Sequence, residues 1–142
     1  MREILFRAKT IEDTDHANKG EWVHGFIAED QTGDFFNKIG AVGIWGKTYA
    51  GNNFFVAVDP ETVGEYTGLQ DKNGVKIFEG DILLVDTARG SEPHYQKRVV
   101  EWKTPYFSGF VYDKAEYKPQ YHEVIGNIHD NPELLEGKTN EV

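Results

Sequence analysis

The stretch "GLQDKNGVKIFEGDILLV", from Gly68 to Val85, constrains the fold more than any other part of the sequence. It places two glycine-centred turns between short apolar runs. Asn73-Gly74 is the pair that tight β-hairpins favour, because both residue types tolerate a positive φ. Gly80-Asp81 predicts a second, sharp turn, in which Gly80 supplies backbone freedom and Asp81 accepts hydrogen bonds from nearby N–H groups. The stretch therefore predicts a hairpin followed by a steeply departing strand.

A calcium-binding loop is the alternative interpretation of the same residues. The letters DKNG echo half of an EF-hand loop, but placing Gly74 at its sixth position puts Leu69 first and Gly80 twelfth, where calcium needs carboxylates. Glu79 and Asp81 have no base or metal ligand near them in the sequence, so we expect two solvated turn carboxylates rather than a catalytic pair. We expect no catalytic residue, no metal site and no cofactor.

Short alternating or wholly apolar runs, separated by glycine, asparagine and proline, continue along the whole chain, a pattern typical of all-β proteins. Asp59-Pro60 marks a break. We therefore expect a mainly β protein, with residues 1–63 as an N-terminal β extension and residues 64–142 as an SH3-like small barrel. One continuous domain over residues 1–142 is the alternative.

We expect five strands in the barrel. A short helical turn over residues 131–136, with Asn131 as its N-cap, follows the last of them. The Gly80-Asp81 turn resembles the diverging turn of SH3-like barrels. Strand alternation predicts the barrel core. Its expected members are Ile77, Ile82, Leu84, Val99, Phe110 and Ile125.

The composition limits the classes of function. The chain has no cysteine and a formal net charge of −9. The lack of cysteine excludes disulfides, a thiolate nucleophile and a cysteine-based zinc site, and suits a reducing cytoplasm. The longest apolar run, residues 54–58, is too short to cross a membrane, so we expect a soluble protein with no membrane partner. The acid excess disfavours nucleic-acid binding, which depends on neutralising phosphates.

The aromatic residues of the C-terminal half are the strongest candidates for a binding surface, and His24 is expected to be half-buried packing. Alternation should send some of the rings inward and leave the others exposed. Exposed rings could cover a subunit interface, grip a peptide or stack on bases. The candidates for this aromatic surface are Trp102, Tyr106, Phe107, Tyr112, Tyr117 and Tyr121.

Three stretches together resemble one family, the YopX-like proteins of phages and prophages. They are the opening "MREILFRA", the central "VDPETVGEYTGLQDKNGVKIFEGDILLV" and the closing "HEVIGNIHDNPELL". The resemblance implies a phage-encoded protein, cytoplasmic in a bacterial host, without an established activity. It brings no catalytic motif, so it assigns no role to any residue.

Two hypotheses for the function follow. The first is a non-enzymatic accessory protein that self-associates and contacts other proteins, of the phage or of the host. The second is a single-stranded nucleic-acid-binding barrel in phage replication or transcription, which would need a basic and aromatic groove. The cations expected to form that groove are Lys97, Arg98, Lys103, Lys114 and Lys118.

Overall fold

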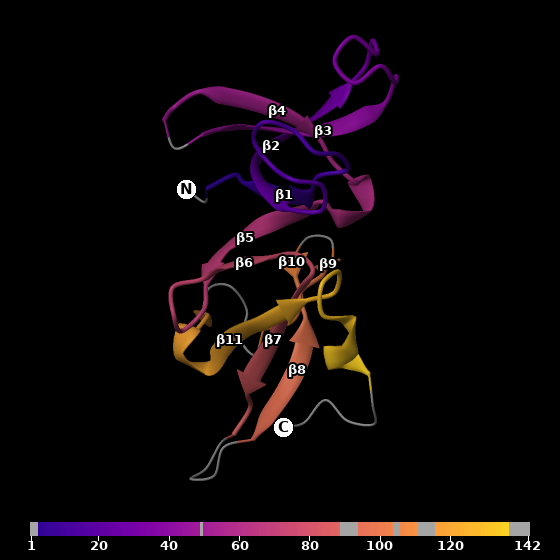
Figure 1. The fold of residues 1–142 in the computed structure, drawn as a ribbon. Helices are drawn as coiled ribbons and strands as arrows, with labels where there is room; N and C mark the ends of the chain where they lie inside the picture. Colours follow the sequence, from indigo (N-terminus) through magenta and orange to yellow (C-terminus); the bar gives the residue numbers. More distant parts are fainter. Residues whose placement is uncertain (1–2, 49, 89–93, 104–105, 111–115, 137–142) are drawn as a thin grey trace. The chain divides into compact units, whose positions relative to one another are not determined.

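The computed structural model describes residues 3–48, 50–88, 94–103, 106–110 and 116–136. These residues form antiparallel strands joined by turns and short 3₁₀ helices, so the expected mainly β fold is confirmed (Figure 1). The chain divides into two compact units, Met1–Tyr66 and Thr67–Val142, here called unit 1 and unit 2. Strand β5 (Gly64–Gln70) runs from one unit into the other.

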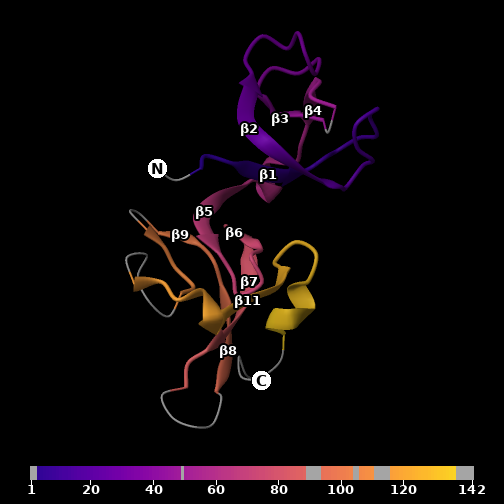
Figure 2. The same ribbon diagram turned by 90° about the vertical axis from the view of Figure 1, so that its left-hand side faces the viewer.

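Unit 1 is built on a sheet in which the strands follow the order β4-β3-β2-β1-β5-β6, whose last strand, β6 (Lys76–Phe78), belongs to unit 2 (Figure 2). An isolated bridge between Thr10 and Val58 joins the end of β1 to the end of β4, so the sheet curls back on itself. The 3₁₀ turn η1 (Pro60–Thr62) follows. The strand bounds are β1 Phe6–Lys9, β2 Trp22–Asp30, β3 Ala41–Lys47 and β4 Asn53–Ala57.

The concave side of this sheet holds the core of unit 1. Alternate residues of the strands point inward, and the next residues point to the other side. The Thr62 hydroxyl accepts the N–H of Lys9 at 2.8 Å and donates to the carbonyl of Asp59 at 2.7 Å, which ties η1 to β1. The buried apolar side chains are Ala8, Ala17, Val23, Ile44, Val56 and Val58.

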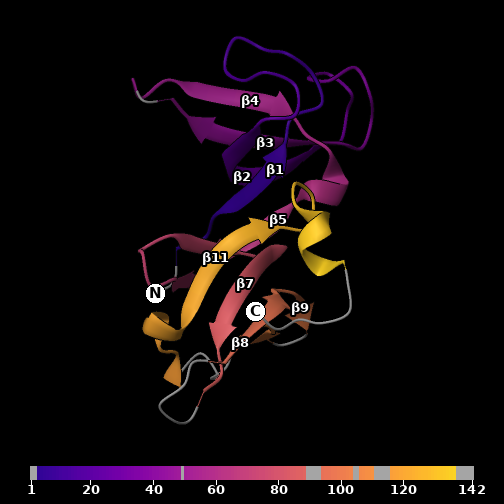
Figure 3. The same cartoon turned by 60° about the horizontal axis from the view of Figure 1, so that its bottom comes forward.

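Unit 2 contains a three-stranded sheet in the order β11-β7-β8 and a two-stranded sheet of β9 and β10 (Figure 3). The strand number and lengths suit a small barrel, although the described strands do not close one. The strand bounds are β6 Lys76–Phe78, β7 Asp81–Asp86, β8 Tyr95–Val99, β9 Trp102–Lys103, β10 Tyr106–Phe107 and β11 His122–Asn127. The 3₁₀ turns are η3 Pro119–Tyr121 and η4 Pro132–Leu135.

The core of unit 2 differs in part from the expected one. Ile77 and Ile82 are fully buried as expected. In β7, however, it is Leu83 and Val85 that join the core cluster, while Leu84 is only half-buried. Four consecutive apolar residues in this strand hide the phase of the alternation. The other expected core residues, all half-buried, are Val99, Phe110 and Ile125. The observed core cluster is Ile77, Leu83, Val85, Val100 and Phe107.

The turn after β5 is organised by a buried carboxylate. Asp71 accepts the N–H groups of Asn73 at 2.8 Å and Val75 at 3.0 Å through Oδ1, and that of Val124 in β11 at 2.9 Å through Oδ2. Gly74 has a φ of 80°, whereas Asn73 does not have a positive φ. The turn is therefore not the doubly left-handed type expected from Asn-Gly, because the carboxylate holds Asn73 in a right-handed turn.

The Gly80-Asp81 turn is also tied to other strands. Gly80 has a φ of 92° and donates its N–H to the carbonyl of Val100 at 2.8 Å. Asp81 accepts the N–H of Phe78 at 2.7 Å, which is the local bond expected for it. Its side chain is only 1% exposed, so the expectation of a solvated carboxylate is wrong. The close packing of β7 excludes water and leaves the backbone as its partner.

Asn131 stands at the N-cap position of η4, but its side chain makes no capping bond. Its Oδ1 instead accepts the N–H of Asn127 at 3.2 Å. A Cβ added at Gly126 would lie 2.6 Å from that oxygen, so the glycine gives Asn131 room to reach back to β11.

Ile82→Asp should unfold unit 2. It replaces a fully buried aliphatic side chain by a charge with no partner, at an expected cost of about 4 kcal/mol or more of unfolding free energy. Thermal denaturation followed by circular dichroism checks this, with Val75→Asp, at a position 48% exposed, as the matched control. A variant that keeps its melting temperature would contradict the core described here.

Candidate binding surface

The side of the unit 1 sheet that points away from its core carries a row of three aromatic side chains. Phe26 of β2 lies opposite Trp45 of β3, and Trp45 lies opposite Phe55 of β4. Phe26 is 56% exposed and Trp45 is 48% exposed. The row is a consequence of alternation, because the next residue along each strand points into the core. We call this side of the sheet the outer face.

The loop between β2 and β3 adds two more rings to the outer face. Asp30 accepts the N–H groups of Gly33 at 2.9 Å, Phe35 at 3.0 Å and Phe36 at 2.8 Å. Burial acts to raise the pKa of Asp30, but these hydrogen bonds together outweigh it and hold the pKa below its usual value. The Phe55 ring centroid lies 5.5 Å from that of Phe35 and 4.7 Å from that of Phe36. The carboxylate thus fixes two rings against the sheet.

Gly43 is the middle one of three glycines that are three residues apart, at positions 40, 43 and 46. A Cβ added there would lie 2.5 Å from a ring carbon of Phe55 and 2.7 Å from one of Phe36. Real Cβ atoms do not come that close to other heavy atoms, so an alanine would push the rings off the sheet. The glycine at this position serves the packing of the rings.

Two hollows flank Trp45 on the outer face. One, of about 280 Å³, is apolar. The other, of about 300 Å³, is mixed in character and includes Phe26, His24 and Lys47. Phe35, which lines the apolar hollow, is 73% exposed, and so is Ile39 from the same loop; among the large apolar side chains that the structure describes, these two are the most exposed. The apolar hollow is lined by Ala28, Phe35, Trp45 and Phe55.

Cationic side chains lie next to the aromatic row. On β1, Arg7 pairs with His24 and Lys9 pairs with Trp22 of β2. The Arg7 guanidinium lies 4.6 Å from the Trp22 ring centroid, and the Lys9 Nζ lies 5.4 Å from it. Lys47 ends β3, two residues after Trp45. His24 is exposed rather than half-buried, because it points to the outer face and not to the core.

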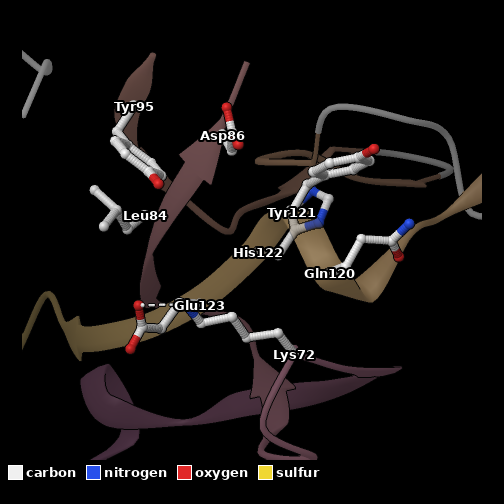
Figure 4. Close-up of a pocket in the computed structure, with 8 residues that line it drawn as sticks. All are labelled: Lys72, Leu84, Asp86, Tyr95, Gln120, Tyr121, His122 and Glu123. Carbon is white, nitrogen blue, oxygen red and sulfur yellow. Dashed lines mark ion pairs between the residues drawn. The ribbon is translucent and has the colours of Figure 1, made fainter. Parts of the chain in front are cut away.

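Unit 2 has a smaller, polar pocket of about 150 Å³ on its β11-β7-β8 sheet (Figure 4). Lys72 and Glu123 form an ion pair at 3.4 Å along one edge, with both side chains partly exposed. The volume is below the range of small-molecule sites and equals that of about five waters. We therefore place the candidate site in unit 1. The pocket is lined by Lys72, Leu84, Asp86, Tyr95, Gln120, Tyr121, His122 and Glu123.

His122 is the buried titratable group of this pocket. Its side chain is 1% exposed, and its Nδ1 lies 2.9 Å from the carbonyl oxygen of Lys118. Its ring centroid lies 4.7 Å from that of Tyr117 and 5.8 Å from that of Phe110. Burial lowers the pKa of His122, and the charge of Arg98 lowers it further, against the opposing effect of the carbonyl. The neutral imidazole is therefore favoured in the fold.

Tyr117 is likewise a structural group. Its hydroxyl donates to the carbonyl of Gln70 at 2.7 Å. Burial raises the pKa of Tyr117, and the negative charge of Asp71 raises it further. The phenol is held protonated, as a donor to β5.

The expected aromatic surface of the C-terminal half is only partly exposed. Trp102 is 48% exposed and Tyr106 is 55% exposed, on the β9–β10 hairpin. Phe107 is 4% exposed and belongs to the core, with its ring 4.8 Å from that of Trp102. Phe107 is therefore not a surface residue, because alternation in β10 turns it inward while Tyr106 points outward.

The remaining candidates do not extend that surface. Tyr117 and Tyr121 are half-buried, and Tyr112 lies outside the described residues. Sequence reasoning missed the outer face of unit 1. The alternation around Phe26 and Trp45 indicates that each strand has two different faces, but it does not indicate which face is exposed.

The structure does not gather the expected basic groove in unit 2. Lys97 and Arg98 follow each other on β8 and so point to opposite faces. Lys103 forms an ion pair with Glu101 at 3.3 Å. Lys114 lies outside the described residues. Lys103 lies opposite the exposed Tyr106 in the β9–β10 pair.

The described part of the chain contains neither a metal-binding cluster nor a membrane-spanning helix. No group of three or more histidine, aspartate or glutamate side chains there could hold a metal ion. Nor is any helix there long and apolar enough to cross a membrane.

The unfolding free energy should fall as the pH drops below about 6.5, the usual pKa of histidine. The folded state disfavours protonation of His122, so the unfolded state takes up the proton first. The loss ends once the pH is below the lowered pKa of the folded state. One group gives at most about 1.4 kcal/mol per pH unit. Urea unfolding across this range checks it: His122→Gln should flatten the profile, whereas the control His24→Gln should not. An unchanged profile in His122→Gln would refute this assignment.

Comparison with known proteins gives a family and a similar fold. The chain matches the family described as YopX protein over residues 6–136. A solved structure, the crystal structure of protein EF1440 from Enterococcus faecalis, is 26% identical, with a TM-score of 0.51, and the match covers 96% of this chain and 100% of that one. No curated protein matches. The family match spans nearly the whole chain, in agreement with the resemblance of its three stretches, and the protein belongs to the YopX family.

Proposed function

We propose that this protein is a non-enzymatic protein-interaction module that self-associates through the apolar side of the outer face. The observation that carries the proposal is the exposure of large apolar side chains around the apolar hollow. Phe26, Phe35 and Trp45, on the outer face in and beside this hollow, together expose roughly 270–440 Å², if each full side chain offers 150–250 Å². Ile39, 73% exposed and from the same loop as Phe35, adds to this. The sum reaches the upper range for the largest apolar patch of a monomer.

The chemistry of the apolar side suits a protein partner. Tryptophan and phenylalanine are enriched at protein interfaces, and charged residues are depleted from the interface centre. Ala28, Phe35, Trp45 and Phe55 line the apolar hollow without a charged group among them. A second copy can therefore meet this surface without placing charges opposite each other, although the chain carries a net charge of −9. Other phage or host proteins with an apolar patch are further partners under this proposal.

The roles of the buried titratable groups support a non-enzymatic protein. Asp30, Asp71 and Asp81 each accept backbone N–H groups. His122 contacts a backbone carbonyl through Nδ1. These groups hold loops in place and do not converge on one pocket. We further propose that the protein is phage- or prophage-encoded and acts in the bacterial cytoplasm, as the family resemblance implies.

Sedimentation velocity over micromolar concentrations tests self-association. We expect a concentration-dependent shift from monomer to dimer. The double variant Phe35→Ser/Ile39→Ser should raise the dissociation constant at least about tenfold, because it removes the two most exposed apolar groups. The control Trp102→Ser/Tyr106→Ser changes two exposed aromatic side chains of unit 2 and should leave association intact. A strict monomer throughout, or equal effects of the two double variants, would contradict the proposal.

A further inference from the structure

The polar pocket of unit 2 has the size of a single long side chain (Figure 4). Its volume of about 150 Å³ is too small for a typical drug-sized molecule and equals that of about five waters. The side chain of lysine, an ammonium group on a four-carbon stem, fills about the same space. The pocket therefore has room for the end of one such side chain, or for a free molecule of similar length.

Three neighbouring strands place most of the lining on one side of their sheet. Leu84 of β7 lies opposite Glu123 of β11, and Asp86 of β7 lies opposite Tyr95 of β8. Residues opposite each other in an antiparallel pair point to the same side, and so do residues two apart along one strand. Half-buried Leu84 thus supplies an apolar surface next to both carboxylates.

The lining carries more negative than positive charge. Asp86 and Glu123 contribute two carboxylates and Lys72 one ammonium, whereas the neutral imidazole of His122 adds no charge. Lys97 points to the same side of the sheet, but its Nζ donates to a backbone carbonyl of η4 at 3.1 Å and does not line the pocket. Diagonal neighbours such as Asp86 and Glu123 have Cβ atoms about 7–8 Å apart, so both carboxylates attract a cation placed between them.

Several acceptor atoms of the lining have no partner among the described residues. Asp86 Oδ1 accepts the N–H of Ala88 at 2.9 Å, but its Oδ2 accepts no bond. The hydroxyl of Tyr95, on the strand opposite, also makes no hydrogen bond. An ammonium has three N–H groups to donate, so it can use both of these atoms at once.

The chain itself contains one contact of the same kind. The Nζ of Lys72 lies 3.4 Å from Glu123 Oε1, and both side chains are partly exposed. An exposed ion pair of this type contributes little to stability, so it opens easily. Lys72 therefore partly neutralises Glu123, whereas no cation of the described residues pairs with Asp86.

We infer that the polar pocket of unit 2 binds a primary alkylammonium group, carried either by a lysine side chain of a partner protein or by a free polyamine. The ammonium donates to Asp86 Oδ2 and to the Tyr95 hydroxyl, and its stem lies along Leu84. An anion would meet two carboxylates there, and a neutral alcohol would leave the charge of Asp86 without a counterion. Because so small a ligand makes few contacts, we expect a dissociation constant in the millimolar range.

Titration of the isotope-labelled full chain with n-butylammonium, followed by heteronuclear NMR, tests the inference. We expect saturable shifts of the backbone amide signals of residues 84–86 and 121–123. Neutral 1-butanol and anionic butyrate, which have similar lengths, should cause no saturable shift of the same signals. Saturation distinguishes a site from general attraction of cations to a chain with a net charge of −9.

Charge-matched variants locate the site. Asp86→Asn should weaken binding at least about fivefold, because it removes the charge but keeps the acceptor for the N–H of Ala88. Glu101→Gln makes the same change in net charge at an exposed residue of unit 2 that does not line the pocket, and should change affinity less than about twofold. Melting curves of both variants should show a folded protein.

The competing lysine gives a second, opposite expectation. Lys72→Gln should strengthen binding at least about twofold, because it removes a cation from the edge of the pocket. Lys103→Gln, at a lysine of unit 2 that does not line the pocket, makes the same change in net charge and should have no such effect.

Spermidine and a glycine-rich peptide with one lysine distinguish the two sources of the ammonium group. Tighter binding of spermidine assigns the pocket to free polyamines, and tighter binding of the peptide assigns it to a partner protein; both results support the inference. It is overturned if butylammonium gives no saturable shifts, if butyrate binds as strongly, if Asp86→Asn and Glu101→Gln lose equal affinity, or if Lys72→Gln binds more weakly. None of these results bears on self-association, whose test changes Phe35 and Ile39 of unit 1.

Discussion

Three buried carboxylates, Asp30, Asp71 and Asp81, hold the loops on which both units depend. Short strands joined by tight turns leave many backbone N–H groups outside the sheet ladders, and each must find an acceptor. A carboxylate can accept several at once, and these bonds offset the cost of burying its charge. Asp71 does this across the chain, joining the turn after β5 to Val124 in β11. Part of the acidity of the sequence is therefore structural, and only the remainder promotes solubility.

The outer face of unit 1 depends on one of these carboxylates. Asp30 directs the loop after β2 so that Phe35 and Phe36 lie over Gly43 and against Phe55. Without those bonds, the rings would have no fixed position, since nothing in the strand register requires the loop to fold back. The apolar hollow thus depends on Asp30, a charged group that does not line it. The positions of Arg7 and Lys9 have a different origin, because the pairing of β1 with β2 alone places them beside His24 and Trp22.

The residues that form the sharp turn could be predicted from the sequence, but the side of the sheet to which each strand residue points could not. The bonds of Asp81 and the freedom of Gly80 follow from neighbouring residues, so the sharp turn could be predicted. Leu83 and Leu84 could not be told apart, because an uninterrupted apolar run carries no phase. The outward position of Phe26 depends on which side the curled sheet closes around, a tertiary event. The separation of Lys97 from Arg98, in contrast, could have been predicted from the sequence, because alternation places adjacent strand residues on opposite faces.

The net charge of the chain does not show which charged residues the fold brings together on one face of a sheet. Arg7, Lys9 and Lys47 lie up to forty residues apart in the sequence, and β2 lies between the two strands that carry them. A count along the sequence spreads these cations among more numerous acids and hides their proximity. The face on which a charge lies therefore follows from the strand pairing and not from its place in the sequence.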